Sequence, residues 1–461
     1  MAWVNIILLT LLFSVVFFRP RLNYHRLVLF LGVLGIISLL RPGPYGPGDF
    51  QAHTALSMSL YGSLKAGIFP VRWADHLCGG YGCPLFMFSY QTPYYLISLF
   101  HLLGFTFIAG TKLLLALTFI GSGIAMFSWA RRRFGSLAGF ASTAFYLYCP
   151  YHLVAVNFKV TVGEAVSFAL LPLLLYLTDK YFSKPSRKLQ LLIIYLIALF
   201  ILSHQAISLI GILFWLAYIF YYYRGIRVGL SLLLPAIGLT AFYWLPIFAY
   251  AKYIHQSQMI HISYPSFTGL LFSPYRFGLL FQGPNAQLTD TIGIPQILVV
   301  LLALVFLKKD RFFLAVFFIT VYMTLKTSQP IWELLPILKN FQFSARFLFL
   351  TAFSTSALAG QLIQTLRSRY TPLIIFIIYL SVLITALNWG NRQTLPEVTD
   401  ATIRQTLSSR GDFNFTPIAD FPGWTPVDAK FVNTPLISFA NITSLVCFLL
   451  LLFRCLLHLK K

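Results

Sequence analysis

The sequence has few charged residues: Asp, Glu, Lys and Arg make up only 10% of its 461 residues. In soluble globular proteins about a quarter of the residues are charged. Hydrophobic residues account for 58% of the chain, and the mean hydropathy is +0.78. The low charge argues against an ordinary soluble enzyme, and the high hydropathy excludes a disordered chain. Together they indicate an integral membrane protein.

Several chemical motifs are also missing. The sequence contains no Walker A phosphate loop, no dinucleotide-binding glycine motif and no GxSxG nucleophile motif. These absences argue against a nucleotide-driven pump and against a serine hydrolase. No pair of histidines has a zinc-site spacing such as HExxH. The sequence therefore requires no cofactor, indicates no metal ligands, and leaves dependence on a divalent metal open.

Long apolar runs recur along the whole chain. A helix needs about 20 residues to cross a bilayer, and about thirteen runs come close enough to count as candidate spans. We therefore expect an all-α polytopic fold. The first run lacks a basic segment before it and a small-residue cleavage site after it, so we expect an anchor rather than a removed signal peptide. The candidate spans are 3–18, 25–40, 111–129, 136–153, 165–179, 189–205, 206–223, 228–249, 291–307, 311–327, 345–363, 371–388 and 437–455.

The positions of the charges predict how these spans are oriented. The net charge is +22, from 34 Lys and Arg against 12 Asp and Glu. If the N-terminus lies outside, the cytoplasmic loops and the tail after 453 hold 20 basic residues and two acids, Asp179 and Asp310. The net charge is then +18 inside and +4 outside, as the positive-inside rule expects. The cytoplasmic loops are 19–26, 130–135, 179–188, 224–227, 308–311 and 364–370.

The same rule bears on the apolar run 84–104, which contains Pro84 and Pro93. If this run crossed the membrane, Arg131–Arg133 would lie outside, so we expect it to be re-entrant or interfacial. Because the positive charge is explained by orientation, we expect membrane lipids but no nucleic acid as partners.

Three outer regions are too long to be simple connections. Two are the loops 41–110 and 250–290, and the third, 389–436, is polar and is predicted to form a small outer cap. We therefore expect a transmembrane module over 1–388, this cap, and a last helix with a basic cytoplasmic tail over 437–461. Loops of such length usually carry function or are disordered.

The twelve acids can be considered one by one. Asp179 and Asp310 lie in the predicted basic cytoplasmic loops, and we expect them to have only a topological role. Charges in a polar cap are normally solvated. We therefore expect solvated side chains at the five acids of the cap, Glu397, Asp400, Asp412, Asp420 and Asp428. Five acids remain near the outer surface: Asp49, Asp75, Glu164, Asp290 and Glu333. We expect Asp290 and Glu333 to be loop or cap residues rather than catalysts.

Asp49 begins the most informative stretch. Residues 49–66 mix polar and apolar side chains and are predicted to form an amphipathic interfacial helix. A spacing of four would put Asp49 and His53 on one helical face. Asp49 could also cap this helix, a role compatible with catalysis. Cys78 and Cys83 follow in the same outer loop, where their spacing permits a disulfide without requiring it.

Two further sites lie at span edges. Glu164 ends the segment 157–164, and an ionisable group at a span edge is by default a functional candidate. It could equally stabilise a helix N-terminus, and nearby Lys159 could simply extend towards the interface. His204 lies at the outer end of a helix, where a lone histidine is more often a hydrogen-bonded structural residue than a ligand.

The stretch from Asp49 to Tyr95 resembles the first outer loop of GT-C glycosyltransferases, polytopic enzymes that use polyprenyl-phosphate-linked sugars. More narrowly, the chain resembles a bacterial subgroup known as 6-pyruvoyl-tetrahydropterin synthase-related membrane proteins. The likeness rests, in order, on Asp49 and His53, Pro70 and Trp73, Gly-Tyr-Gly-Cys-Pro-Leu-Phe at 80–86, Pro93, Lys159 to Glu164, Ser203-His204, Phe242-Tyr243-Trp244-Leu245-Pro246, Ile331-Trp332-Glu333, Phe341-Gln342-Phe343 and Arg346.

The sequence departs from these relatives at three points. The subgroup usually has an arginine where Lys159 stands, and Pro-Trp where this chain has Ser344-Ala345. Many GT-C enzymes have a second acid after the first, whereas here Phe50 follows Asp49. The resemblance therefore implies a reaction class and leaves the sugar and the acceptor open.

The resemblance implies a GT-C-like fold and a glycosyltransferase of the bacterial plasma membrane, with its active site on the outer face and its C-terminus in the cytoplasm. A lipid phosphate leaving group needs positive charge, which Lys159, Arg346 and Lys112 could supply. Asp49 is the best-placed general base, and one direct displacement would invert the anomeric carbon. His53 and Glu164 could orient the acceptor, a glycan, lipid or protein, and a substrate groove could include Trp73, Tyr81, His204 and Trp244.

Two other functions stay open from the sequence. One is a transporter or flippase for a lipid-linked glycan, but such a protein should show repeats and ionisable groups at the membrane midplane. The other is a non-catalytic scaffold of cell-surface glycan assembly, which the missing acid after Asp49 would allow. The clustering of acids at one surface favours the enzyme.

Overall fold

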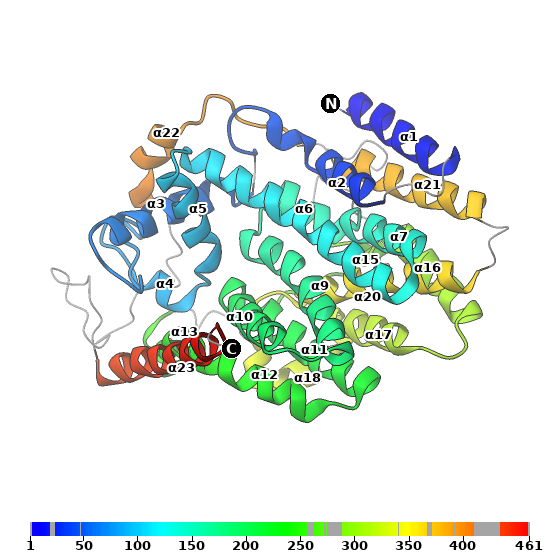
Figure 1. The fold of residues 1–461 in the computed structure, drawn as a ribbon. Coiled ribbons are helices and arrows are strands. Elements are labelled where there is room, and N and C mark those ends of the chain that lie inside the picture. The colour runs from blue at the N-terminus through cyan, green and yellow to red at the C-terminus, as the bar shows by residue number, and fades with distance from the viewer. Residues whose placement is uncertain are drawn as a thin grey trace. The chain divides into compact units, whose positions relative to one another are not determined.

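A computed structural model describes residues 2–18, 24–46, 48–255, 262–271, 273, 288–339, 341–366, 371–390, 392–409 and 434–459 (Figure 1). Across these ranges the regular elements are helices, and the only strand-like pairings are three isolated bridges. The predicted all-α fold is therefore confirmed. Most of the predicted loop 250–290 and of the predicted cap 389–436 lies outside the described residues, including Asp412, Asp420 and Asp428.

A helix occurs at each predicted span, but the count of thirteen spans stays a prediction. In the described part of the chain, six helices are long and apolar enough to cross a membrane, or eight if two bent pairs are counted as spans. The bends are 72° between α12 and α13 and 90° between α17 and α18. The run 84–104 forms two short helices, α4 (Leu85–Phe88) and α5 (Thr92–Leu102), because Pro93 starts α5 after a break.

The chain divides into two compact units. The first contains residues 1–50, 112–176 and 261–397. Helices α6 (Phe107–Phe134) and α9 (Val162–Ser183) run through both units. The other helices of the first unit are α1 (Ala2–Phe18), α2 (Tyr24–Gly35), η1 (Ile37–Leu40), α7 (Ser136–Leu147), α8 (Pro150–Val154), η2 (Ala155–Lys159), α15 (Phe267–Leu271), α16 (Ile294–Phe306), α17 (Phe312–Thr324), η4 (Lys326–Ser328), α18 (Gln329–Leu334), α19 (Pro336–Lys339), η5 (Ser344–Phe347), α20 (Leu348–Thr365) and α21 (Thr371–Trp389).

Helix α20 forms the centre of the first unit. It packs against α7, α16 and α17, and every residue from Leu348 to Leu362 is buried. Small residues allow this close packing: a Cβ on Gly360 would lie 2.3 Å from the Ser142 hydroxyl of α7. Helix α1 lies beside α21, where the hydroxyls of Thr10 and Tyr379 are 2.9 Å apart (Figure 1).

The second unit contains residues 51–111, 177–260 and 398–461. In it α13 and α12 pack against α23, and α10 packs against α5 and α12 (Figure 1). Its other helices and the bounds of those just named are α3 (Phe50–Lys65), α10 (Arg187–Ser203), α11 (Gln205–Tyr223), α12 (Ile226–Leu239), α13 (Ala241–Tyr250), η3 (Ala251–Tyr253), α22 (Asp400–Gln405), η7 (Leu407–Ser409) and α23 (Pro435–Leu459).

Two acids of the second unit accept hydrogen bonds that the sequence did not predict. Asp179 was expected to be a topological loop residue, but it is buried at the end of α9 and accepts hydrogen bonds of 2.8 Å from both Tyr218 and Tyr223. Asp400 was expected to be solvated. Its carboxylate instead accepts the backbone N–H groups of Phe107 and Ile108 at 2.7 and 3.0 Å, at the start of α6. The N–H groups at the start of a helix lack backbone partners and attract a carboxylate, which explains why Asp400 binds there instead of pointing into solvent.

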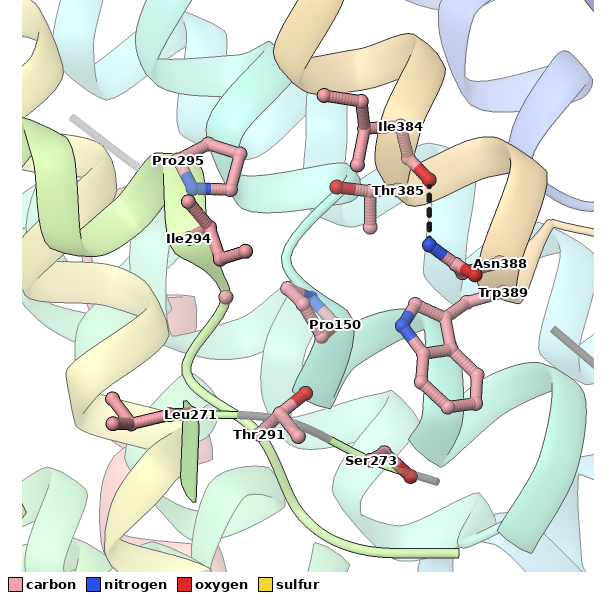
Figure 2. A pocket seen from close by; sticks show the side chains of 11 residues that line it. Pro150, Leu271, Ser273, Thr291, Ile294, Pro295, Ile384, Thr385, Asn388 and Trp389 are labelled. Atoms are coloured by element: carbon pink, nitrogen blue, oxygen red, sulfur yellow. Dashed lines mark hydrogen bonds between the residues drawn. The ribbon is translucent and has the colours of Figure 1, made fainter. Parts of the chain in front are cut away.

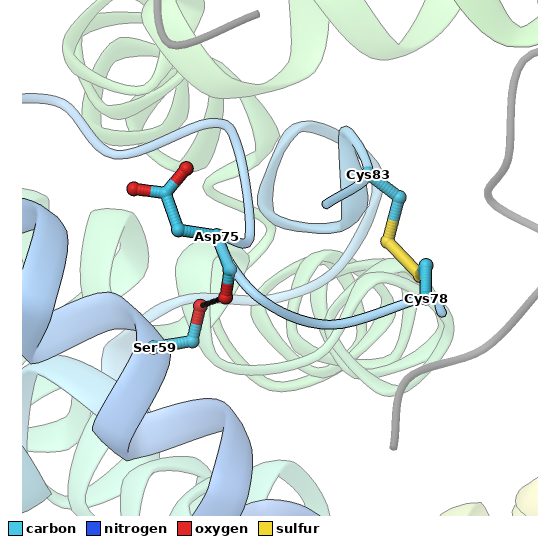
Figure 3. The surroundings of a disulfide bond; sticks show 4 residues. All are labelled: Ser59, Asp75, Cys78 and Cys83. Carbon is cyan, nitrogen blue, oxygen red and sulfur yellow. Dashed lines mark hydrogen bonds between the residues drawn. A yellow bond between two sulfur atoms is a disulfide. The ribbon is translucent and has the colours of Figure 1, made fainter. Parts of the chain in front are cut away.

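The loop after α3 is closed by a disulfide between Cys78 and Cys83 (Figure 3). The backbones of Ala74 and Cys83 pair at its base. The hydroxyl of Ser59 on α3 donates a 2.9 Å hydrogen bond to the backbone oxygen of Asp75, which ties the loop to the helix (Figure 3).

Candidate active site

Lys159 connects two acids of the first unit. Its ammonium group lies 2.5 Å from the Asp290 carboxylate, and its backbone oxygen accepts a 3.0 Å hydrogen bond from the backbone N–H of Asp49. Asp49 directly precedes α3, which begins at Phe50. Two residues that the sequence singled out, Asp49 and Lys159, are therefore neighbours in the structure. Asp290, which the sequence assigned to a loop role, joins them.

The segment that presents Lys159 has an unusual backbone. Pro150 starts α8, and the chain then forms a single π-helical turn over Ala155–Lys159. Val160 follows in the left-handed region with φ of 61°, a conformation that β-branched residues rarely adopt. Helix α9 begins two residues later, which leaves Lys159 in a sharp bend between two helices. Such π turns and strained residues are concentrated at functional sites.

A close backbone approach fixes Asp49 to this bend. Gly48 has φ of +121°, and a Cβ at this position would lie 2.2 Å from the backbone oxygen of Phe158. Only glycine fits both the torsion angle and the space. Gly48 therefore allows Asp49 to reach the backbone of Lys159.

Glu164 forms a second group of contacts with Tyr151 and Arg346. The Tyr151 hydroxyl donates a 2.9 Å hydrogen bond to one carboxylate oxygen, and the Arg346 guanidinium lies 3.9 Å from the other. The Glu164 side chain is only 6% exposed. Its place in the first turn of α9 also favours a negative charge. Both roles that the sequence left open for Glu164 are compatible with this position.

Arg346 is positioned by a short 3₁₀ turn, η5, just before α20. It donates hydrogen bonds to the backbone oxygen of Phe341 at 2.5 Å and to the Gln342 side-chain oxygen at 3.4 Å. The hydroxyl of Ser344 anchors the turn by donating to the backbone oxygen of Thr324 at 2.7 Å. Ser344 thus holds the turn by a hydrogen bond.

The electrostatics of Asp49 suit a proton acceptor. Removal of water by the surrounding protein raises the pKa of this carboxyl, and the positive charge of Lys159 partly offsets the rise. Asp49 itself remains exposed and accessible to a substrate. Lys159 and Arg346 each face a carboxylate, from Asp290 and Glu164 respectively. Neither cation is therefore without a negative partner.

Lys112, the third predicted phosphate ligand, lies in a different environment within the same unit. Its ammonium group donates to the backbone oxygen of Arg41, and Arg41 donates a 3.1 Å hydrogen bond to the backbone oxygen of Arg392. The Arg392 guanidinium lies over the Phe158 ring, 4.8 Å from its centroid. In the described ranges, neither Arg41 nor Lys112 forms an ion pair with an acid.

The histidines from the sequence analysis belong to the second unit. The His53 imidazole and the Tyr94 hydroxyl form a 2.9 Å hydrogen bond, and burial lowers the pKa of His53 to about 4. His204 stacks on Tyr90 with centroids 5.1 Å apart, and Tyr90 stacks on Tyr94. His53 is therefore neutral at pH 7 and lies beside a stack of aromatic rings.

The predicted groove residues differ in exposure. Trp73 is 4% exposed, and its indole lies where a Cβ on Gly82 would come within 2.3 Å. Trp73 therefore packs against the disulfide loop rather than lining an open surface. Trp244 is half-buried and donates a 2.9 Å hydrogen bond to the backbone oxygen of Ile237. Tyr81, at the tip of the loop, is 83% exposed and free to contact a substrate.

The first unit contains a pocket (Figure 2). Its empty volume is about 440 Å³, part of it open solvent, and one of its lining residues, Thr291, directly follows Asp290 in the sequence. The Asn388 amide donates a 3.1 Å hydrogen bond to the backbone oxygen of Ile384 along one wall. The other lining residues are Pro150, Leu271, Ser273, Gly293, Ile294, Pro295, Thr385 and Trp389. Among the described residues, no three His, Cys, Asp or Glu side chains gather to hold a metal ion.

Sequence reasoning did not connect Asp290 with Lys159 or Tyr151 with Glu164. Asp290 pairs with a lysine 131 residues away, and no local pattern marks such a pairing. Tyr151 could have been suspected from its place one turn before the unusual 155–160 segment.

Solved structures with a similar fold include two glycosyltransferases. The arabinofuranosyltransferase AftD from Mycobacteria is 14% identical with a TM-score of 0.49, over 81% of this chain and 27% of that chain. ArnT from Cupriavidus metallidurans, solved with undecaprenyl phosphate bound, is 15% identical with a TM-score of 0.44, over 75% of this chain and 60% of that chain. The chain thus spans less than two thirds of the length of either protein.

A comparison with curated proteins found no match. A family model described as "6-pyruvoyl-tetrahydropterin synthase related domain; membrane protein" matches residues 88–391, well over half of the chain. Lys159, Glu164, Asp290 and Arg346 lie inside the match, and Asp49 precedes it. The narrower resemblance predicted from the motifs is confirmed: the chain belongs to the family of 6-pyruvoyl-tetrahydropterin synthase-related membrane proteins.

Proposed function

We propose that this membrane protein is a glycosyltransferase that moves a sugar from a polyprenyl-phosphate donor to an acceptor hydroxyl on the outer face of the bacterial plasma membrane. Asp49 is the general base. The observation that carries the proposal is the meeting of Asp49 with Lys159 and Asp290, which come from three distant parts of the chain. The motif resemblance of the first outer loop to GT-C enzymes supplies the reaction class.

The reaction fits the charges around Asp49. The acceptor oxygen attacks the anomeric carbon of the sugar, while the bond between that carbon and the lipid phosphate breaks. Asp49 takes the proton of the acceptor hydroxyl, and the bonding electrons leave with the phosphate. One displacement from the face opposite the leaving group inverts the anomeric carbon. A raised pKa brings a carboxylate closer to the range in which a base works best near neutral pH.

The other candidate residues have supporting roles in this proposal. Lys159 holds Asp49 through its backbone and Asp290 through its ammonium group. Glu164, fixed by Tyr151 and Arg346, orients the acceptor. His53 belongs to the second unit, where burial lowers its pKa to about 4, so its imidazole is neutral at pH 7.

The leaving phosphate requires cations. The sequence assigned Lys159, Arg346 and Lys112 to this task, but Lys159 and Arg346 already face carboxylates. They can bind a phosphate only if it displaces Asp290 or Glu164, whereas Lys112 has no such competitor among the described residues.

The alternatives are a flippase for a lipid-linked glycan and a non-catalytic scaffold. The scaffold alternative is based on the absence of a second acid directly after Asp49 in the sequence. Asp290 weakens that argument, because it brings a second carboxylate to the same lysine from another part of the chain.

Reconstitution into vesicles with a radiolabelled polyprenyl-phosphate sugar tests the proposal. Label appearing on a separated acceptor, or released as free sugar, supports the transferase if Asp49→Asn lowers that signal. Intact labelled lipid that moves between leaflets, with no transfer or hydrolysis, favours the flippase. If the protein neither turns over nor moves any of the labelled donors, the result favours the scaffold.

A further inference from the structure

We propose that Asn157 is a positioning residue that holds Lys159 and Asp49 in place for sugar transfer. Asn157 lies in the middle of the π turn Ala155–Lys159, and it acts through that turn. No motif in the sequence gives Asn157 a role. That the geometry it holds serves catalysis rests on the proposed function. That Asn157 holds this geometry does not.

The Asn157 side chain is fully buried and uses both ends of its amide group. Its nitrogen donates hydrogen bonds to the backbone oxygens of Gly35 at 3.1 Å and Trp389 at 3.0 Å. Its oxygen accepts a 3.3 Å hydrogen bond from the Tyr45 hydroxyl. An asparagine amide has two N–H donors, so both are occupied by backbone carbonyls.

The two carbonyls belong to the ends of two helices. Gly35 is the last residue of α2, and Trp389 is the last residue of α21. The final carbonyls of a helix have no partner within that helix. Asn157 provides a partner for one carbonyl of each, from positions 122 and 232 residues away. A single side chain therefore joins the ends of α2 and α21 to the π turn.

A buried chain of hydroxyls holds the oxygen of the Asn157 amide. The Ser38 and Tyr45 hydroxyls are 2.7 Å apart, and Tyr45 donates to Asn157. Because a tyrosine hydroxyl has a single proton, Ser38 must donate to Tyr45. All three side chains are fully buried, so water does not replace a bond that is lost. Removing Asn157 would leave buried polar groups without partners, which is costly.

The π turn requires such support. Ala155–Lys159 is one turn of π-helix, and Val160 follows it with φ of 61°. A helix of a single turn is not stable by itself, and a β-branched residue in the left-handed region is strained. Strained backbone persists only where surrounding contacts hold it. The three hydrogen bonds of Asn157, at the centre of the turn, provide such contacts.

The next two residues connect Asn157 with the proposed base. The Phe158 ring packs edge-on against Trp389, with centroids 5.3 Å apart, and a Cβ on Gly48 would lie 2.2 Å from the Phe158 backbone oxygen. The backbone oxygen of Lys159 accepts the N–H of Asp49 at 3.0 Å. A shift of the π turn therefore moves both the oxygen that holds Asp49 and the Lys159 ammonium group.

The first test is hydrogen–deuterium exchange of the purified full-length protein in detergent, followed by mass spectrometry in peptides that contain the Asp49 amide. Asn157→Ala removes all three hydrogen bonds, and Asn157→Asp keeps the shape of the side chain without its two N–H donors. The matched control is Asn5→Ala. Asn5 is 3% exposed, lies in α1 of the same unit, and donates a 3.5 Å hydrogen bond to the backbone oxygen of Gly390.

We expect the Asp49 amide to exchange at least about tenfold faster in both Asn157 variants than in the wild type, because its hydrogen bond to Lys159 opens more often. In Asn5→Ala the same amide should exchange at the wild-type rate. Wild-type exchange in both Asn157 variants overturns the proposal. An equal acceleration in Asn5→Ala also overturns it, because a general loss of stability would then explain the result.

The second test separates positioning from donor binding. With a radiolabelled polyprenyl-phosphate sugar, folded Asn157→Ala should lower kcat at least about tenfold and change KM for the donor less than about threefold, because a displaced base slows the chemical step. Asn5→Ala should keep both constants. A raised KM with an unchanged kcat would contradict the positioning role.

If neither Asn157 variant folds, Tyr45→Phe decides, because it removes only the hydroxyl that joins Ser38 to Asn157. Its Asp49 amide should exchange faster than that of Asn5→Ala, and an equal rate overturns the proposal. Faster exchange in the variants of a protein that transfers no sugar refutes the proposed function alone. Transfer by the wild type, with unchanged Asp49 exchange in the variants, refutes the positioning role alone.

Discussion

The ammonium group of Lys159 lies 2.5 Å from the carboxylate of Asp290, which is 131 residues further along the chain. The same lysine accepts the backbone N–H of Asp49. One residue at a strained bend thus organises two acids that the sequence separates widely. This arrangement motivates the assignment of Asp49 as base, and it makes the charge of Lys159 a control on the protonation of Asp49.

The pH dependence of transfer should reveal that control. The pKa of Asp49 is raised by loss of water and lowered by Lys159. A base must be deprotonated, so the rate should fall as the pH falls through this pKa. Lys159→Gln removes the lowering charge, so the acid limb of the pH–rate profile should move to higher pH. Lys159→Arg should keep the limb near that of the wild type.

The profile is measured as kcat/KM from pH 4 to pH 8, with Lys65→Gln as a control for a distant positive charge. An acid limb that stays in place in Lys159→Gln, or moves to lower pH, would show that Lys159 does not set the pKa of the catalytic group.

The buried contacts of Glu164 should contribute to stability. Arg346→Gln leaves the Glu164 carboxylate, which is 6% exposed, without its cation. We expect a loss of about 1–3 kcal/mol in the free energy of unfolding, because the buried carboxylate keeps its Tyr151 hydrogen bond but loses the nearby guanidinium charge. The double variant Glu164→Gln with Arg346→Gln should recover part of that loss. Thermal unfolding in detergent measures both, with exposed Arg404→Gln as the control. A double variant less stable than Arg346→Gln would contradict this explanation.

The carboxylate of Asp400 caps the start of α6 by accepting two backbone N–H groups. Asp400→Ala leaves these groups without their partner, and should lower stability by about 1 kcal/mol. Asp400→Asn keeps one acceptor and should lose less. Thermal unfolding of the two variants beside Glu397→Ala, an exposed acid nearby in sequence, checks the order. Equal unfolding temperatures for all three would show that the cap adds no stability.

The orientation can be tested with single cysteines at exposed positions. Glu397→Cys lies on the predicted outer face and Lys184→Cys in a predicted cytoplasmic loop. A membrane-impermeant maleimide added to intact cells should label Glu397→Cys and should reach Lys184→Cys only after permeabilisation. The reverse pattern would invert the topology and place the Asp49 site on the cytoplasmic side. The parent chain, with its own cysteines, gives the background labelling.

The sequence predicted the parts of this protein that depend on local patterns. Apolar length located the candidate spans, and the polar–apolar pattern of residues 49–66 predicted α3, which occurs at Phe50–Lys65. Motif order identified the family. Asp49, Lys159, Glu164 and Arg346 were each chosen from their position at a span edge, and all four lie in the first unit.

Other features depend on tertiary contacts that carry no local signal. Asp290 looked like any loop acid because its partner Lys159 is distant in sequence. Trp73 looked like a groove residue because aromatic residues favour membrane boundaries, but the glycine turn at Gly82 buries it. Asp179 lies in a basic segment, and only the fold brings Tyr218 and Tyr223 to its carboxylate.

The most direct test of the central claim is the rate of sugar transfer by Asp49→Asn, measured with saturating radiolabelled donor at pH 7. Glu397→Gln, which changes an exposed acid in the same unit, is the matched comparison. If Asp49 is the general base, Asp49→Asn should transfer at least about 100-fold more slowly than the wild type, while Glu397→Gln keeps its rate. Folded Asp49→Asn protein that transfers sugar as fast as Glu397→Gln would contradict the account.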